Sequence, residues 1–292
     1  MKAVFFYIFY GFVWLITLLP MPVLYLKSDF AFFIVYHVLK YRKKVVLNNL
    51  HNAFPEKDET EINIIAKRFY RHFCDIFIES VKTIHITKKQ VNRRYRFQNP
   101  EVFNELYDRN KGVILVSGHY GNWEWMINFP AFVKHKFLVI YKPLKSKYFT
   151  NFINNLREKF GAEMITMKES YKIIMQCHKE NHPAITWFLA DQSPPKEARY
   201  WTTFLNQDTP VFLGPEKISV KTGHAVVYME VLKVKRGVYD ITFTKITEDS
   251  KNTAPNEITE KHVKLLEQSI QRNPQYWLWS HRRWKYKKYA KK

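Results

Sequence analysis

An uncharged stretch near the N-terminus, from Ala3 to Leu26, constrains the fold of this chain most strongly. As one helix rising about 1.5 Å per residue it would reach roughly 36 Å, and the hydrocarbon core of a bilayer is about 30 Å thick. Pro20 and Pro22 would end or kink that helix near its far end. We therefore expect residues 1–27 to form a transmembrane or membrane-anchoring helix, followed by one domain over residues 28–292.

Two other interpretations of this stretch stay open. A cleaved signal peptide would use Lys2 in its n-region, but the apolar run is long for one and no small-residue cleavage site follows it. A buried core helix would have the same composition. Basic residues are more frequent after the stretch than before it, which predicts that the large domain lies on the cytoplasmic side. A second apolar run, Phe30 to Leu39, is too short to span a membrane and is expected in the membrane interface or on the domain.

The chain is strongly basic, with 47 Lys and Arg against 26 Asp and Glu and a formal net charge of +21. This excess favours an anionic partner, which could be nucleic acid, a membrane surface, or an acidic carrier or substrate. The hydrophobic share of 46% suffices for a core and excludes a mainly disordered chain. From Trp277 onward aromatic and basic residues alternate, which suits a membrane surface better than nucleic acid if the N-terminus is an anchor.

Metal and thiol chemistry have little support in the sequence. Cys74 and Cys177 are the only cysteines, and neither lies in a metal-ligand spacing or beside groups that would activate a thiolate. His178 and His182 are four residues apart, but Pro183 follows and no third ligand is apparent. We expect no metal, no cofactor and no disulfide.

Beyond residue 112, short apolar runs alternate with helical patterns. Strands are predicted at Val113–Val116, Phe137–Tyr141, Ala184–Ala190, Ala225–Leu232 and Val238–Thr244. Helices are predicted at Glu61–Ile84 (with Thr60 as N-cap), Trp123–Val133, Tyr148–Lys159, Tyr171–Lys179 and Glu257–Gln271. The alternation is typical of an α/β fold with a mixed, mostly parallel sheet flanked by helices. Functional residues then belong in loops at the carboxyl ends of strands.

The first predicted strand runs directly into the segment SGHYGNWE, which carries His119 and Glu124. Small residues at a strand end can present these two side chains, five positions apart, at the opening of a helix. A carboxylate beside the imidazole would fix its tautomer, so that the other ring nitrogen could take a proton from an attacking hydroxyl. A structural histidine beside a glutamate is the alternative that the spacing leaves open.

The segment HYGNWE resembles the H-x4-D/E signature of the glycerolipid acyltransferase superfamily, in the HGNWE form typical of bacterial lipid A late acyltransferases. Other segments resemble that family's motifs in the same order: VVLNNLHNAFPE, YKP, NNLR, FLADQ, TPVFLGPEKISVKTG and PQYWLWSHRRW. Together they extend from about residue 40 to residue 286. Two departures are the sequence VFLG where the family commonly has Phe-Phe-Gly, and Lys142 where it has an arginine with a planar donor pair.

The resemblance implies an O-acyltransferase in which Glu124 orients His119 and His119 acts as general base on an acceptor hydroxyl. The hydroxyl would attack an acyl thioester without an acyl-enzyme. Candidate substrate-binding residues are Asn122, Arg157, Asp191, Gln192, Arg282 and Arg283. By analogy Arg157 would bind a phosphate or the oxyanion, whereas a solvated helix arginine is its alternative. Asp191 would support the site or position the acceptor, with a structural cap as its alternative.

The implied donor is acyl carrier protein or acyl-CoA, and the implied acceptor is a lipid A precursor. The implied location is the bacterial inner (cytoplasmic) membrane, with the domain on the cytoplasmic side and an anionic membrane surface as a further partner. Two alternatives remain open: another phospholipid or aminolipid acceptor, and a non-catalytic basic protein that binds a membrane or nucleic acid. We do not expect nucleic acid as a partner, because an anchor and an acylation site account for the positive charge.

Overall fold

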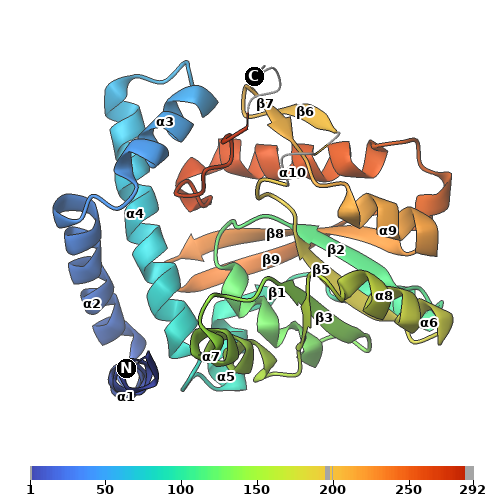
Figure 1. The fold of residues 1–292 in the computed structure, drawn as a ribbon, viewed down its shortest axis with the longest axis horizontal. Coiled ribbons are helices and arrows are strands. Elements are labelled where there is room, and N and C mark those ends of the chain that lie inside the picture. The colour runs from blue at the N-terminus through green and yellow to red at the C-terminus, as the bar shows by residue number, and fades with distance from the viewer. Residues whose placement is uncertain (1, 195–197, 199, 287–292) are drawn as a thin grey trace.

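A mixed sheet forms the centre of the fold. The computed structural model describes residues 2–194, 198 and 200–286, so residues 287–292 of the predicted basic tail lie outside the described residues. The strands are β1 (Tyr95–Phe97), β2 (Val113–Ser117), β3 (Lys136–Tyr141), β4 (Glu163–Thr166), β5 (Ala184–Leu189), β8 (Ala225–Lys235) and β9 (Val238–Thr247), in the spatial order β1-β9-β8-β2-β5-β3-β4 (Figure 1). Only the β8–β9 pair of this described sheet is antiparallel, which confirms the predicted mixed, mostly parallel sheet.

Helices cover both faces of this sheet (Figure 1). They are α3 (Lys43–Ala53), α4 (Glu59–Lys82), α5 (Lys88–Arg94), α6 (Glu101–Asp108), the 3-10 helix η2 (Trp123–Ala131), α7 (Lys147–Glu158), α8 (Ser170–Lys179), α9 (Gly214–Thr222) and α10 (Glu257–Arg272). The central strand β2 is buried throughout. Its Val113 and Leu115 join the core on the η2 side, and Ile114 and Val116 join the core on the side of α4 and α10.

The helices predicted from Glu61 onward and the strands predicted from Val113 onward all form, with ends that differ by a few residues. Helix α4 begins two residues early because its N-cap is Asp58 rather than Thr60. The Asp58 side chain accepts a hydrogen bond from the backbone of Glu61, whose carboxylate accepts one in return, and this Asp-x-x-Glu capping box is readable in the sequence. The short strands β1 and β4, the separate hairpin of β6 (Trp201–Phe204) and β7 (Gln207–Pro210), and helices α5, α6 and α9 were not predicted.

The N-terminal stretch is not one helix. An end or kink at Pro20 is confirmed, but the prediction of a helix from Ala3 to Leu26 that is long enough to span a membrane is wrong. Helix α1 (Lys2–Thr17) ends before Pro20, and α2 (Met21–Phe33) starts after it and continues into the π-helix η1 (Ile34–Val38). Proline fixes its own φ and disfavours a helical conformation in the residue before it, which separates the two helices. In Figure 1, α1 is seen nearly end-on while α2 runs up the page beside α4.

A buried lysine stabilises this break. Lys82 Nζ donates hydrogen bonds to the backbone oxygens of Thr17 (2.7 Å) and Leu19 (2.9 Å), which the end of α1 leaves without helical partners. Helix α1 has 16 residues and is therefore about 24 Å long, shorter than the ~30 Å of a hydrocarbon core. Among the described residues no single helix meets the length and hydropathy needed for a span; a pair bent by 87°, Met21–Val38 with Lys43–Ala53, meets them together.

Helix α2 is tied to the domain by polar contacts. Tyr25 Oη donates to the buried Glu79 of α4 at 2.8 Å, and Ser28 Oγ donates to Asp75 at 2.8 Å. The guanidinium of Arg236 contacts both Asp75 and Asp29. The predicted boundary between residues 27 and 28 therefore falls inside a helix that packs on the domain.

Candidate active site

Two neighbouring parallel strands deliver the central pair of the site. In the register of β2 with β5, Ser117 lies opposite Leu189. Two residues further along each strand the chain places His119 and Asp191 at the same level, at the carboxyl edge of the sheet. His119 Nδ1 lies 2.6 Å from Asp191 Oδ1, and the backbone N–H of His119 donates to Asp191 Oδ2 at 2.8 Å. This double contact fixes the position of the imidazole relative to the carboxylate.

Asp191 is held as a carboxylate. Its side chain is 3% exposed, and Trp277 Nε1 donates a further hydrogen bond to Oδ2 at 2.8 Å. Burial alone would raise the pKa of Asp191, but the charge of His119 and the hydrogen bonds from His119 and Trp277 outweigh it and lower the pKa to about 2. With the proton on His119 Nδ1 facing this anion, Nε2 carries the lone pair. Gln192 Nε2, on an exposed side chain, lies 3.3 Å from it.

The C-terminal segment builds the other wall of the site. Tyr120 and Trp277 form an antiparallel bridge, Gly121 N donates to the Tyr276 oxygen at 3.0 Å, and Leu278 N donates to the His119 oxygen at 3.1 Å. Trp277 was not among the predicted site residues. The sequence marked Trp277 only as part of the segment PQYWLWSHRRW. Its contact with Asp191 could not be predicted, because the two residues are more than 80 positions apart in the chain.

Glu124 lies elsewhere than the sequence predicted. Its Oε1 accepts a hydrogen bond from Arg157 Nη2 at 2.8 Å and its Oε2 accepts one from Arg157 Nε at 3.1 Å, so the two side chains form a two-pronged ion pair. Burial would raise the pKa of Glu124, but the charge and hydrogen bonds of Arg157 keep the pKa below its ordinary value. The expectation that Glu124 directly orients His119 is thus corrected, because Asp191 occupies Nδ1.

A comparison with models of protein families identifies the family of the chain. The model of the family described as bacterial lipid A biosynthesis acyltransferase matches residues 1–286. The chain belongs to this family. A comparison with curated proteins gives no match. Membership implies an acyltransferase. His119 lies in the segment HYGNWE, whose motif suggested the family.

Asn122 of this acyltransferase is a structural residue rather than an exposed substrate ligand. Its side chain is completely buried. Oδ1 accepts a hydrogen bond from Trp125 N at 3.1 Å and caps η2, while Nδ2 donates to Glu79 Oε2 at 2.6 Å. These contacts use both ends of the amide, so the prediction that Asn122 binds substrate is corrected.

Asn122→Ala should therefore destabilise the fold rather than weaken substrate binding. Loss of the cap, together with loss of one of the three side-chain hydrogen bonds that the buried Glu79 carboxylate accepts, should cost roughly 1–3 kcal/mol of unfolding free energy. Thermal unfolding in detergent micelles measures the effect. If Asn122→Ala had the native unfolding midpoint and a raised KM for the acceptor, Asn122 would be a substrate-binding residue after all.

Gly121 is required by the geometry of the loop. Its φ is +63°, a region that favours glycine, and a Cβ there would lie 2.6 Å from Val231 Cγ1. Gly121→Ala should lower the unfolding free energy by at least about 1 kcal/mol and reduce acyl transfer, because the loop carries His119. Gly11→Ala is the matched control, since nothing lies within 4 Å of its Cβ and the site is helical. Equal unfolding midpoints for the two variants would contradict this.

The two predicted phosphate-binding arginines near the C-terminus have different environments. Arg282 is exposed. Arg283 is only 2% exposed, and its Nη2 donates to the backbone oxygen of Pro210 at 2.7 Å. Direct contact between Arg283 and an acceptor phosphate is therefore corrected, while phosphate binding by Arg282 stays a prediction.

The cysteines and histidines outside the site show no sign of reactive chemistry. Burial raises the pKa of the Cys74 thiol to about 12 and raises that of Cys177 above its ordinary value. Within the part of the chain that the structure describes, no group of three or more His, Cys, Asp or Glu side chains could hold a metal ion.

Proposed function

We propose that this protein transfers a fatty acyl chain from an acyl thioester, carried by acyl carrier protein or CoA, to a hydroxyl of a lipid A precursor. The observation that carries the proposal is the contact of 2.6 Å between His119 Nδ1 and Asp191, at a strand end, in a member of the lipid A biosynthesis acyltransferase family. This contact holds the His119 imidazole in the orientation that a general base needs. His119 is partly exposed, so its Nε2 can meet a hydroxyl in the place where Gln192 now lies.

The proposed reaction needs no acyl-enzyme. The acceptor oxygen attacks the thioester carbonyl carbon while its proton passes to His119 Nε2. The Asp191 carboxylate stabilises the imidazolium that forms. When the tetrahedral intermediate collapses, the C–S bond breaks, and the proton on Nε2 passes to the leaving thiolate. The products are an ester and a free thiol, and His119 returns to its starting state.

Arg157 is proposed to bind substrate phosphate or the oxyanion. Its guanidinium is held in place by the two hydrogen bonds to Glu124, and its side chain is 23% exposed. In this arrangement Glu124 acts by positioning Arg157. Gln192, which faces His119 Nε2, is proposed to contact the bound acceptor.

The direct test uses the purified full-length chain in detergent micelles with a lipid A precursor and a long-chain acyl thioester. Acyl carrier protein and CoA thioesters are supplied in separate reactions. Mass spectrometry should find the acceptor heavier by one acyl group, with release of one thiol for each acceptor acylated. Acylation of an added phospholipid or aminolipid in place of the lipid A precursor would overturn the proposed acceptor.

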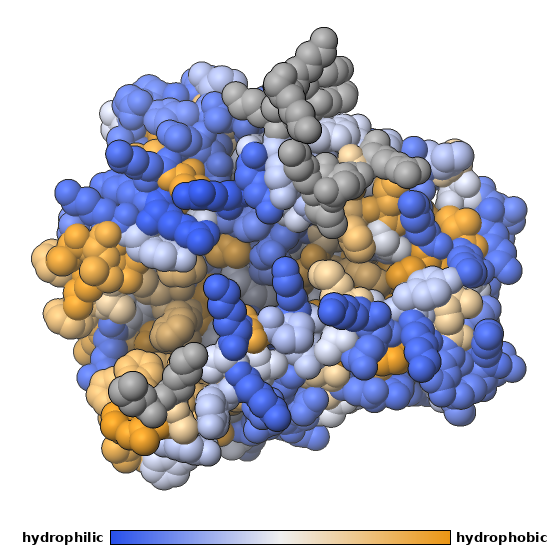
Figure 2. Space-filling model, in the orientation of Figure 1, coloured by the Kyte–Doolittle hydropathy of each residue, from blue (hydrophilic) through white to orange (hydrophobic). Residues whose placement is uncertain are grey.

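We also propose that the protein lies on an anionic membrane through its N-terminal helices, with the catalytic domain on the cytoplasmic side of the bacterial inner membrane. Apolar side chains cover the outer face of α1 and α2, on the left of Figure 2, and the most exposed are Phe5, Ile8, Leu26 and Phe30. Exposed Lys27, Lys40 and Lys44 accompany them. An apolar surface with basic residues matches lipid tails and anionic headgroups.

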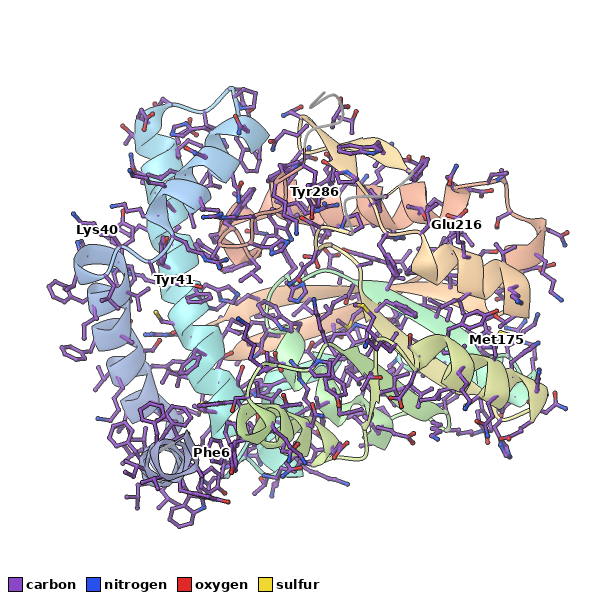
Figure 3. All side chains as sticks on the ribbon, viewed as in Figure 1. Phe6, Lys40, Tyr41, Met175, Glu216 and Tyr286 are labelled. Carbon is purple, nitrogen blue, oxygen red and sulfur yellow. The ribbon has the colours of Figure 1, made fainter. Side chains whose placement is uncertain are left out.

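Helix α1 brings this surface next to the catalytic domain. Phe6 packs on Tyr148 (ring centroids 5.5 Å apart) and on Phe149 (5.2 Å), and both of these residues lie on α7, the helix that carries Arg157 (Figure 3). A protein resting on the bilayer through α1 would thus hold the Glu124–Arg157 pair close to the lipid surface. A lipid acceptor could then reach the site without leaving the membrane.

Introducing charge into the outer face of α1 should weaken membrane binding. The double variant Phe5→Asp and Ile8→Asp should lower the fraction that floats with vesicles containing anionic lipid by tenfold or more, because two large apolar side chains lose their burial in lipid. Val220→Asp on α9 is the matched control. Binding of the native protein should also fall as salt rises. Equal flotation of all three proteins would contradict this surface.

A further inference from the structure

A small cavity lies beside Asp191, and Arg283 also lines it. The cavity has a volume of about 10 Å³, enough for roughly one water molecule and far too small for an acyl chain. Asp191, Ser117 and His262 contribute to its polar lining, and the remaining residues around it are Ala190, Phe204, Val211, Tyr228, Val263 and Leu266. All of these residues are buried, so the cavity belongs to the interior of the protein.

Arg283 brings an unusual set of free donors to this cavity. The residue is 2% exposed, yet its Nε and Nη1 have no hydrogen-bond partner among the residues that the structure describes. His262 Nε2, also buried, is likewise without a partner there. A buried guanidinium with two unpaired N–H groups is costly, and proteins retain such groups where a buried water or a neighbouring charge compensates.

Among the described groups that line the cavity, the only anion is Asp191. Burial lowers the pKa of Arg283 to about 10, which leaves the guanidinium positively charged at neutral pH. Burial lowers the pKa of His262 to about 4, so its imidazole is neutral there. The carboxylate of Asp191 thus has two cationic or cation-forming neighbours, His119 on the substrate side and Arg283 on the buried side.

We propose that Arg283 is a positioning residue for the acyl-transfer reaction, whose buried charge acts on the Asp191 carboxylate and through it on His119, with one water in the cavity bridging Arg283 to Asp191. This rests on the proposed function, because it assigns a role in general-base catalysis. The negative charge of Asp191 stabilises the imidazolium form of His119, and the positive charge of Arg283 offsets part of that negative charge. Removal of the cation therefore makes protonation of His119 easier.

The other charged groups around His119 cannot supply this effect. Glu124 lies in an ion pair with Arg157 and is negative. Burial lowers the pKa of His281 to about 4, so its imidazole is neutral. Arg282 and Lys285 are exposed, and water and salt screen their charges. Within the described part of the chain, Arg283 is thus the buried cation that shares a cavity with Asp191.

The test is the pH dependence of kcat/KM for acyl transfer with Arg283→Met, in the full-length protein. The acidic limb of the profile, where His119 becomes protonated, should move to higher pH by about one unit, so activity below the limb should fall about tenfold. Activity well above the limb should change less. Lys285→Met removes the same formal charge from an exposed side chain two residues further on and should leave the limb in place. Arg283→Lys keeps the charge and should also leave it near its native position.

A measurement without turnover separates this proposal from the proposed function. NMR of histidine-labelled protein follows the protonation of the His119 ring, with the signal assigned by its absence in His119→Gln. A higher titration midpoint in Arg283→Met supports the proposal even if no acyl transfer is found. An identical midpoint and an unmoved limb overturn it, as does a one-unit shift in Arg283→Lys, which remains decisive if Arg283→Met fails to fold.

Discussion

Replacement of His119 by glutamine should lower kcat for acyl transfer by about 10²–10⁴-fold, since a positioned general base contributes a factor of this size. Glutamine is close to histidine in volume and can still donate to Asp191 Oδ1, so the fold should survive. The measurement is the rate of ester formation from a thioester donor, with thermal unfolding measured alongside. His182→Gln is the matched control, because that ring is exposed and lies after α8, away from Asp191.

Binding of donor and acceptor should be nearly unchanged in His119→Gln, because the base acts on the transition state more than on the bound substrates. KM should therefore stay within a few-fold of the native value. Transfer at the native rate by a folded His119→Gln protein would exclude His119 as the base and with it the proposed mechanism.

Asp191→Asn should be almost as damaging, with kcat reduced by about 10³–10⁴-fold. The asparagine amide would donate toward His119 Nδ1, which moves the ring proton to Nε2 and removes the lone pair that accepts the hydroxyl proton. The change keeps the size of the side chain, and a direct assay of thiol release measures its effect.

The comparison with Glu124→Gln identifies the orienting carboxylate. Glu124→Gln weakens the pair with Arg157 but leaves the contact of His119 with Asp191, so we expect a smaller loss of kcat and a larger effect on KM. If Glu124→Gln lost more kcat than Asp191→Asn, the assignment of the two carboxylates would have to be reversed.

The strand-end position of His119 could be predicted from sequence, because β2 is a short apolar run followed at once by Ser117 and Gly118. Local patterns also predict that Asp191 follows a strand. What they lack is the pairing of β2 with β5, which sets Ser117 against Leu189 across about seventy residues of chain. Sequence spacing therefore favoured Glu124 as the partner of His119, whereas the sheet register selects Asp191.

Local sequence patterns also could not predict which of two neighbouring side chains is buried. Arg282 and Arg283 are adjacent and chemically identical, yet one is exposed and the other faces an interior cavity, because the backbone turns there to pack on β7. The N-terminal stretch differs for another reason. Its hydrophobicity predicted one helix that Pro20 and Pro22 would end or kink only near its far end, whereas Pro20, together with the carbonyl contacts of Lys82, divides the stretch into α1 and α2.

The central claim is that this chain adds an acyl group to lipid A through His119, and the most direct test is mass spectrometry of the lipids of cells that lack the protein. Lipid A from these cells should be short of one acyl chain. The native gene should restore that chain, and the His119→Gln gene, expressed at the same level, should not. An intact lipid A acylation pattern beside a missing acyl group on some other lipid would contradict the account.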